Sequence, residues 1–495
     1  MRRNHACLTI IAAAALAFAN AGAHAGNLPE RPENIEFRPL DFQPPNAADH
    51  RHETRSGVPV YLAPSREFPL VQINFSFRGG AYLEPADKAG LASMTGAMIR
   101  RGGTVSVSAD ELDERFDFLA ANVSTGSGDV MSSASLNTLT WNLDESLELF
   151  IDMLRRPGFE QEKVRIYRNE SIERMRQRND NPGPILGREW SGLVNGWDHY
   201  SSRVPTRNSL ESITTDDMRA FHAKVFQPGN LIITVTGDFE VDDMLARIEH
   251  ALEGWAHGER MPEPPAPTAT LTPGVYHVEM DIPQGSVAIG MRGVDRDHPD
   301  YFPLLVMNDI LGGGGFTSRI TNRVRSDEGL AYGAGSSMSM PAYFPGVFRA
   351  GFQSKNSTVA LAIKIVKEEI EKIRNQPVTE EERTTSINSF IETFPRSFES
   401  RQGVVSIFAS DEWTGRDPDY WQTYRENIRA VTVEDIQRVA REHLRPEEMA
   451  ILVVGKWEEI APGDHTGRAS MQDFFAGQRN RIPLRDPLTM QPIAE

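Results

Sequence analysis

Cysteine is almost absent from this chain, since Cys7 is the single residue of its type among 495. It lies in an N-terminal stretch that carries two arginines, a short apolar run and an Ala-x-Ala pattern ending at Ala25. This order is typical of a secretory signal peptide, so we expect residues 1–25 to be removed by cleavage after Ala25. The remaining chain then has no cysteine, which excludes disulfides, thiolate metal sites and a cysteine nucleophile.

Long apolar runs and positive charge are also scarce. No segment after the signal peptide approaches the ~20 apolar residues that a membrane-spanning helix needs. Without Arg2 and Arg3, the chain has 50 Lys and Arg against 69 Asp and Glu, a formal charge of −19. Such a charge repels the phosphates of nucleic acids. We therefore expect no membrane span, no nucleic-acid partner and, because of the signal peptide, a periplasmic location.

The usual signatures of nucleotide and serine chemistry are missing. Neither G-x-S-x-G nor S-x-x-K occurs. The stretch "DILGGGGFTSRI" is not followed by Gly-Lys-Ser/Thr, and the residues before it predict a helix where a phosphate loop requires a strand. We interpret it as a helix end that leads through glycines into a second helix, with Phe316, Ile320 and Val324 on one face.

The histidines do not form a ligand set along the sequence. After cleavage, only His50 and His52 are close together, in a polar segment with no further ligands nearby. A solvated loop explains this pair better than a metal site.

The chain contains an internal repeat. The 28 residues from Ser212 align without gaps on those from Ala430, and each copy has a threonine N-cap, an amphipathic helix, a proline turn and a β-rich run ending in glycine. A proline-rich stretch, residues 256–274, lies between the two copies. We expect an N-terminal half at 26–255, this linker, a C-terminal half at 275–460 and a polar tail, extended or poorly ordered, at 461–495.

The front of each half predicts the same kind of structure. Alternating apolar residues predict strands near 58–64 and 69–80 in the first half, and near 274–280 and 284–293 in the second. A further strand pair in the first half precedes two amphipathic helices. The predicted fold class is α+β, with mainly antiparallel sheets covered by helices in both halves.

One predicted helix has a face of very small side chains. In "DKAGLASMTGAMIRRGG", Ser93, Gly96 and Ala97 share one side of the helix and offer almost no chemistry. Their size lets the helix lie close to its neighbours, while nearby leucine and methionine side chains supply apolar area.

Arg325 and Tyr332 form the second candidate site. The stretch "NRVRSDEGLAYGAGSSMSM" predicts a helix that ends at Gly329, followed by an alternating strand. Arg325 lies in the last helical turn and Tyr332 begins the strand. From spacing alone, Arg325 is explained by the helix dipole and Tyr332 by ordinary strand propensity, and a functional role stays open.

These features together resemble the pitrilysin/insulinase-like zinc peptidases, especially the mitochondrial-processing-peptidase-like bacterial branch that is built from two subunits. The resemblance covers nearly the whole mature chain and rests most strongly on "GGGGFTSRI" followed by "VRSDEGLAY". In active members that this chain resembles, the helix with small residues instead has the sequence Gly-Leu-Ala-His-x-x-Glu-His. Its two histidines bind zinc and its glutamate is the general base. Those positions are Ser93, Gly96 and Ala97 here, so the resemblance implies no metal in this chain. Glu170 or Glu173 lies near where such enzymes place the third ligand, but without the histidines it should hold no zinc.

The resemblance implies a clamshell of two homologous halves and a role in proteolysis. We expect a non-zinc-binding subunit of a heterodimeric periplasmic metallopeptidase, inactive alone, whose homologous partner carries the zinc and cleaves peptides. Arg325 and Tyr332 are the residues that the resemblance assigns to the partner's active site. The alternative is an inert pseudo-peptidase with a structural or peptide-binding role, and the sequence leaves homodimer and heterodimer open.

Overall fold

The computed structural model describes residues 41–493, so the predicted signal peptide lies outside the described residues. Pro44–Glu495 form one compact unit. Among the helices of residues 41–493, none combines the length and apolar character that crossing a bilayer requires.

The first sheet has the strand order β1-β2-β6-β3-β5-β4. Only the pair β2–β6 is parallel, and the other neighbours run antiparallel. The strands are β1 (Arg51–Glu53), β2 (Pro59–Pro64), β3 (Leu70–Arg78), β4 (Asn122–Ser127), β5 (Met131–Leu139) and β6 (Leu231–Gly237). In β3, buried and half-exposed side chains alternate along most of the strand, as its sequence predicts.

The second sheet has the order β12-β7-β11-β8-β10-β9 and repeats this topology in all but its edge strand β12, which runs parallel to its neighbour whereas β1 runs antiparallel. Its strands are β7 (Gly274–Glu279), β8 (Gln284–Arg292), β9 (Ala331–Met338), β10 (Val347–Lys355), β11 (Ala450–Gly455) and β12 (Arg479–Ile482). Strands β7, β11, β8, β10 and β9 take the places of β2, β6, β3, β5 and β4. The predicted α+β class, with two mainly antiparallel sheets and covering helices, is confirmed.

The aligned segments of the repeat adopt the same local structure. Thr214 and Thr432 each cap a helix through a capping box, in which the threonine side chain accepts from the backbone of Asp217 or Asp435 and that aspartate accepts from the threonine backbone. The strands that follow, β6 and β11, are buried along almost their whole length. Their nearly continuous apolar sequences fit strands covered on both faces.

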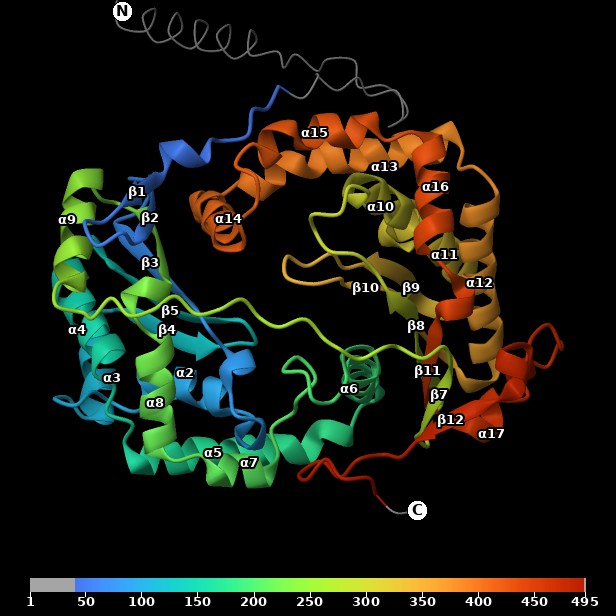
Figure 1. The fold of residues 1–495 in the computed structure, drawn as a ribbon, viewed down its shortest axis with the longest axis horizontal. Helices are drawn as coiled ribbons and strands as arrows, with labels where there is room; N and C mark the ends of the chain where they lie inside the picture. Colours follow the sequence, from blue (N-terminus) through green and yellow to red (C-terminus); the bar gives the residue numbers. More distant parts are fainter. Residues whose placement is uncertain (1–40, 494–495) are drawn as a thin grey trace, which may run out of the picture. The chain divides into compact units, whose positions relative to one another are not determined.

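The helices flank the two sheets (Figure 1). Those that precede the linker are α2 (Leu91–Arg101), α3 (Ala109–Phe118), α4 (Leu143–Arg155), α5 (Gln161–Arg176), α6 (Pro182–Asn195), α7 (Arg207–Ser212), α8 (Thr215–Val225) and α9 (Val241–Leu252). Those that follow it are α10 (Tyr301–Asn308), α11 (Arg319–Thr321), α12 (Val359–Asn375), α13 (Glu380–Thr393), α14 (Arg401–Thr414), α15 (Tyr420–Ala430), α16 (Val433–His443) and α17 (Trp457–Ile460).

Two of these helices cover the sheet of the opposite half. Helix α6 packs on β8 and β11, where its buried Trp190 and Ile185 share a core with Leu452. Helix α14 packs on β2 and β6, and the carbonyl of its Trp413 accepts from the buried guanidinium of Arg78 in β3 (2.5 Å). Each half therefore completes the other half's core (Figure 1).

The segments outside the repeats are attached to the fold. Linker residues 256–273 form no helix or strand, but Met261 is buried and its backbone donates to Asn230. The tail was expected to be extended or poorly ordered; its residues Arg479–Ile482 are extended and form β12, which adds to the second sheet beside β7. Arg485 then pairs with the buried Glu189 of α6 at 3.2 Å. This ion pair and the strand pairing hold the tail on the fold. The polar composition of the tail gave no indication of either contact.

Candidate functional site

Helix α2 carries the three small residues predicted to replace a zinc motif. Ser93 is exposed and its hydroxyl donates to the Gly90 carbonyl at 3.1 Å, whereas Gly96 is buried and Ala97 half-buried. Leu91 and Met94, which point to the other side, lie in the core. None of the three small residues offers an imidazole or a carboxylate.

The buried side of α2 lies directly against strand β4. A Cβ atom on Gly96 would come within 2.5 Å of the backbone of Gly126 and Ser127. The neighbouring Thr125 donates its hydroxyl to the Gly96 carbonyl at 2.6 Å, which fixes this close approach. Position 96 therefore has no room for a side chain.

A buried carboxylate anchors the start of α2. Glu84 accepts from the backbone N–H of Ala92 (2.6 Å) and of Gly90 (3.2 Å). Gly90 has φ +100°, a conformation that favours glycine. The backbone conformation of Gly90 therefore determines the turn "AGLA" that leads into α2. Burial raises the pKa of the Glu84 carboxyl, while these two hydrogen bonds act against that rise.

The glutamates predicted near a third ligand position are engaged elsewhere. Glu170 forms a two-pronged ion pair with Arg101 at the end of α2, with N–O distances of 3.0 and 3.2 Å. Glu173 pairs with Arg176 one turn along α5. Both carboxylates lie in surface ion pairs.

The glycine-rich segment packs against β9. After α10, the chain forms a π-helical turn, η8 (Asp309–Gly313), in which a Cβ on Gly312 would lie 2.5 Å from the backbone nitrogen of Ser336. A second π-helical turn, η10 (Asn322–Asp327), then carries Arg325. The glycines thus permit close backbone packing beside Arg325, and π-helical turns occur frequently at functional sites.

Arg325 lies between two aromatic rings. Its guanidinium carbon is 4.6 Å from the ring centre of Tyr332 and 4.5 Å from that of Phe316. Tyr332 is 89% exposed and Phe316 65% exposed, so both rings reach the surface. Among residues 41–493, no ion pair or hydrogen bond engages the Arg325 guanidinium. Cation–π contacts hold its position while its donors stay available.

This arrangement corrects one sequence interpretation. Phe316 was placed with Ile320 and Val324 on one helical face, but only Ile320 and Val324 are buried. Phe316 belongs to a separate turn, η9 (Gly315–Thr317), which directs its ring toward Arg325. The break in the helix at the glycines turned this residue away from the core.

Tyr332 lies in strand β9 of the second sheet, and Arg325 lies in the turn η10 that precedes this strand. Ser93, Gly96 and Ala97 lie on helix α2, which packs against the first sheet. Within residues 41–493, no hydrogen bond or ion pair joins the two sets.

The histidines also differ from expectation. His50 precedes and His52 lies in strand β1, and both are half-buried rather than in a solvated loop. The structure brings together His298, Asp300 and His443, which sequence inspection missed because His443 is distant along the chain. Only the His-x-Asp spacing of the first two was a visible signal.

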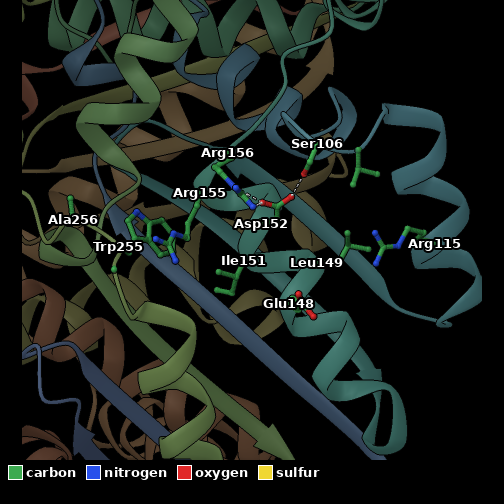
Figure 2. Close-up of a pocket in the computed structure, with 12 residues that line it drawn as sticks. Ser106, Arg115, Glu148, Leu149, Ile151, Asp152, Arg155, Arg156, Trp255 and Ala256 are labelled. Atoms are coloured by element: carbon green, nitrogen blue, oxygen red, sulfur yellow. Dashed lines mark hydrogen bonds and ion pairs between the residues drawn. The ribbon is translucent and has the colours of Figure 1, made fainter.

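A large cavity lies away from these residues. It has a volume of 670 Å³ and is bounded by α4, by the chain just before α3 together with Arg115 of α3, and by the chain after α9 (Figure 2). Its lining is charged, but Arg156 pairs with Asp152, whose carboxylate also accepts from Ser106 at 3.1 Å. None of the predicted site residues lines this cavity.

One family profile matches a central part of the chain, from the end of the first half into the second. Residues 212–390 match the family profile described as peptidase M16 inactive domain. A Helicobacter pylori protein named non-peptidase homolog YmxG is 25% identical over 421 residues, which cover 83% of this chain and 94% of that protein.

Two solved structures share the fold. A peptidase M16 inactive domain from Pseudomonas fluorescens has a TM-score of 0.74 at 24% identity, covering 82% of this chain and 97% of that one. The periplasmic protease PqqL from Escherichia coli has a TM-score of 0.68 at 17% identity, covering 85% of this chain and 47% of that one. The resemblance to the pitrilysin/insulinase-like peptidases is confirmed: residues 212–390 match the peptidase M16 inactive domain, and most of the chain is similar to the relative named non-peptidase homolog.

Proposed function

We propose that this chain is the zinc-less subunit of a heterodimeric peptidase and that it supplies Arg325 and Tyr332 to the active site of a homologous, zinc-bearing subunit. The observation that carries this proposal is the half-buried Arg325, whose guanidinium lies against two exposed aromatic rings and has no hydrogen-bond or ion-pair partner among residues 41–493. An unpaired guanidinium can donate to a substrate carbonyl, and a phenol can donate to the oxyanion that forms during peptide hydrolysis.

The geometry of α2 supports a metal in another chain. Ser93 and Ala97 have no donor atom suited to zinc, and the packing of Gly96 on β4 leaves no space for a catalytic glutamate. We therefore assign no zinc to this helix. The metal and its water would come from the partner.

The edge of the second sheet supports an extended peptide as substrate. Strand β9 is the last strand in its sheet, and its residues Tyr332, Gly333 and Ser337 are exposed. An edge strand can offer unpaired backbone groups to which a peptide adds as a further strand. In β9 these groups lie near Tyr332 and Gly333, because the carbonyls of Ala334 and Ser336 already accept from Thr321 and Asn308. Tyr332 would then lie beside the bound peptide.

Export to the periplasm is part of the same proposal. It rests on the signal-like sequence of residues 1–25 and on the fold shared with a periplasmic protease. The intact mass of exported protein is the test: a chain that begins at Gly26 supports export, and one that retains residues 1–25 contradicts it.

A second candidate function is an inert subunit that binds a partner or a peptide. The same cluster favours it, because tyrosine and arginine are common hot spots of protein interfaces and the Tyr332 ring is 89% exposed. The relative named non-peptidase homolog is consistent with this role. In that case the cluster would matter for assembly and not for turnover.

The experiment combines each variant with the M16-type chain of the same genome that carries His-x-x-Glu-His. Tyr332→Phe keeps the ring that stacks on Arg325 but removes the hydroxyl. We expect an assembled complex with unchanged zinc content and a turnover lowered by about 10²- to 10³-fold. Arg325→Ala should also raise KM, because a substrate contact is lost.

Tyr276→Phe is the matched control, since it removes a hydroxyl that donates to Thr272 elsewhere in the second half. It should leave turnover unchanged. If Tyr332→Phe and Arg325→Ala complexes assemble and cleave at the unmodified rate, the catalytic proposal is wrong. If Arg325→Ala instead prevents assembly while Tyr332→Phe changes nothing, the interface role is correct.

A further inference from the structure

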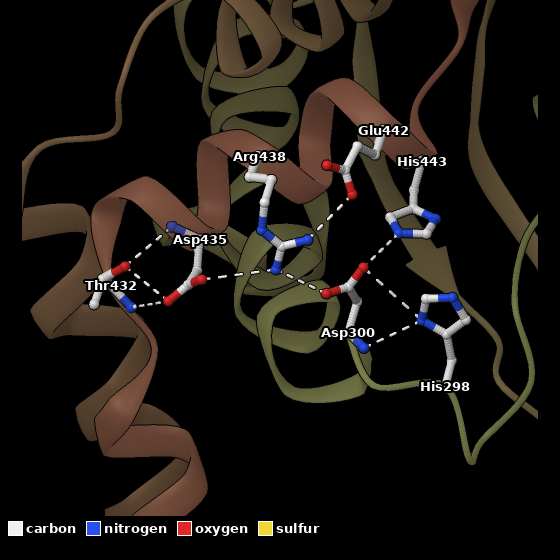
Figure 3. A network of polar contacts seen from close by, with 7 residues as sticks. All are labelled: His298, Asp300, Thr432, Asp435, Arg438, Glu442 and His443. Atoms are coloured by element: carbon white, nitrogen blue, oxygen red, sulfur yellow. Dashed lines mark hydrogen bonds and ion pairs between the residues drawn. The ribbon is translucent and has the colours of Figure 1, made fainter.

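Two histidines and an aspartate meet where helices α10 and α16 pack together. Asp300 is the N-cap of α10, His298 lies two residues before it, and His443 is the last residue of α16 (Figure 3). Within the described residues, this is the one group of three potential ligands whose donor atoms all lie within 4.8 Å of one another. The proposed peptidase role uses none of them.

The carboxylate of Asp300 is central to the cluster. Its Oδ2 atom lies 2.8 Å from Nε2 of His443 and 3.9 Å from Nδ1 of His298. The two imidazole rings stand perpendicular, with their centres 5.1 Å apart. The side chain of His298 is 32% exposed, so a small ion can reach the cluster from solvent.

A surrounding network orients this carboxylate. Arg438 donates to the other oxygen of Asp300 at 2.7 Å and is itself held by Glu442 at 3.1 Å and Asp435 at 3.6 Å (Figure 3). Asp300 thus turns Oδ2 toward the histidines. Such outer contacts, which fix the direction of a ligand, are typical of metal sites.

The charge of the network favours a divalent cation. With both imidazoles neutral, the carboxylates of Asp300, Asp435 and Glu442 face the single guanidinium of Arg438. This leaves two negative charges, which one divalent ion would balance. The positive charge of Arg438 opposes a cation, but its own two carboxylate partners offset it.

We propose that His298, Asp300 and His443 form a binding site for a divalent first-row transition-metal ion, with zinc as its representative. Two nitrogen donors and one carboxylate are a ligand set that such ions favour, whereas magnesium and calcium prefer oxygen. Ligands of a tetrahedral zinc lie roughly 3.3 Å apart, so binding needs side-chain movements of about 1 Å. It also requires His298 Nδ1 to give up the hydrogen bond that it accepts from the Asp300 backbone N–H at 3.1 Å. The ion would displace the proton that His443 and Asp300 share, and solvent would complete its coordination.

This site is separate from α2. A metal bound here would contradict the expectation that the chain holds no metal, but it would not restore the zinc motif of peptidases. A metal here would link α10 to α16 and so stabilise the second half. Its loss would leave the proposed function of Arg325 and Tyr332 unaffected. The two proposals can therefore fail independently.

The experiment uses the full mature chain after removal of metals with a chelator. Calorimetric titration with ZnCl2 should show one ion bound per chain, and titration with MgCl2 should show none. Co²⁺ should give the visible absorption of a nitrogen- and oxygen-ligated ion. His298→Ala, which keeps the contacts of Asp300 with His443 and Arg438, should weaken zinc binding at least tenfold.

His250→Ala is the matched control, because His250 and Glu253 form an exposed histidine–carboxylate pair that has no third ligand in the described chain. It should bind zinc as the unmodified chain does. Absence of one-to-one zinc binding by the unmodified chain, or equal affinity in a folded His298→Ala chain, would overturn the proposal. The cluster would then be a hydrogen-bonded contact between two helices. Because the unmodified chain and its Co²⁺ spectrum are tested first, a misfolded variant does not prevent a decision.

Discussion

The packing of Gly96 on β4 makes a sharp prediction about the degenerate zinc motif. Replacing Gly96 with alanine places a Cβ 2.5 Å from the backbone of Gly126 and Ser127. Overpacking of this kind costs about 1–3 kcal/mol, and a backbone neighbour cannot rotate away. Alanine in a helix interior recovers about 1 kcal/mol relative to glycine. We expect a net destabilisation of up to about 2 kcal/mol.

Gly187→Ala is the control for helix propensity. Gly187 lies inside α6, and a Cβ there would meet no atom within 4 Å. This substitution should stabilise the protein by about 0.5–1 kcal/mol. Thermal unfolding followed by circular dichroism should therefore shift the midpoint downward for Gly96→Ala and upward for Gly187→Ala.

The result bears on function because a peptidase of this type needs glutamate at position 96. If Gly96→Ala raises the midpoint as Gly187→Ala does, then α2 has room for a side chain and our reasoning about the closed helix face is wrong. If the midpoint falls, combining Ser93→His, Gly96→Glu and Ala97→His should destabilise the chain further. Restoring the motif would then not restore an active site.

Three further predictions concern the fold. Burial lowers the pKa of His277 to about 4, below its unfolded value of about 6.5, so the unfolded chain binds the proton first as pH falls. The free energy of unfolding should therefore decrease by at most about 3 kcal/mol between about pH 6.5 and pH 4. His277→Leu should remove this decrease from the pH-dependent unfolding curve, and an unchanged curve would contradict the prediction. Thr214→Ala and Thr432→Ala each remove an equivalent capping box and should each cost about 1 kcal/mol in chemical unfolding, with a clearly unequal effect arguing against equivalence. Proteolytic cleavage within residues 256–274 should leave both fragments together in size-exclusion chromatography, because α6 and α14 each cover the other half's sheet; separation under native conditions would show that these contacts are weak.

Local patterns predicted much of the fold. Alternation located β2, β3, β7 and β8, and the gapless repeat located the matching helices and central strands. These elements are specified by periodicity and capping, which neighbouring residues encode. The family resemblance followed from a few short motifs in fixed order.

Long-range packing could not be predicted in the same way. The exchange of α6 and α14 depends on tertiary contacts between apolar faces that any amphipathic helix presents. Strand β12 has a polar sequence and is defined by its partner β7. The meeting of His298 with His443 likewise depends on how α10 packs on α16.

The candidate site was predicted in part. Arg325 and Tyr332 were identified from spacing and resemblance, but the role of Phe316 as the second ring beside Arg325 was not. When a helix is interrupted, the spacing of an aromatic residue in the sequence no longer shows whether its side chain is buried or exposed. Whether the pair acts in catalysis stays a prediction.

The central claim is that this chain completes the active site of another subunit. The most direct measurement compares cleavage of a fluorogenic peptide library by the zinc-bearing M16-type chain of the same genome, alone and after addition of this chain. We predict that the zinc-bearing chain alone is at least about 100-fold slower than the complex, because the donors of Arg325 and Tyr332 are missing. Equal cleavage with and without this chain would contradict the account.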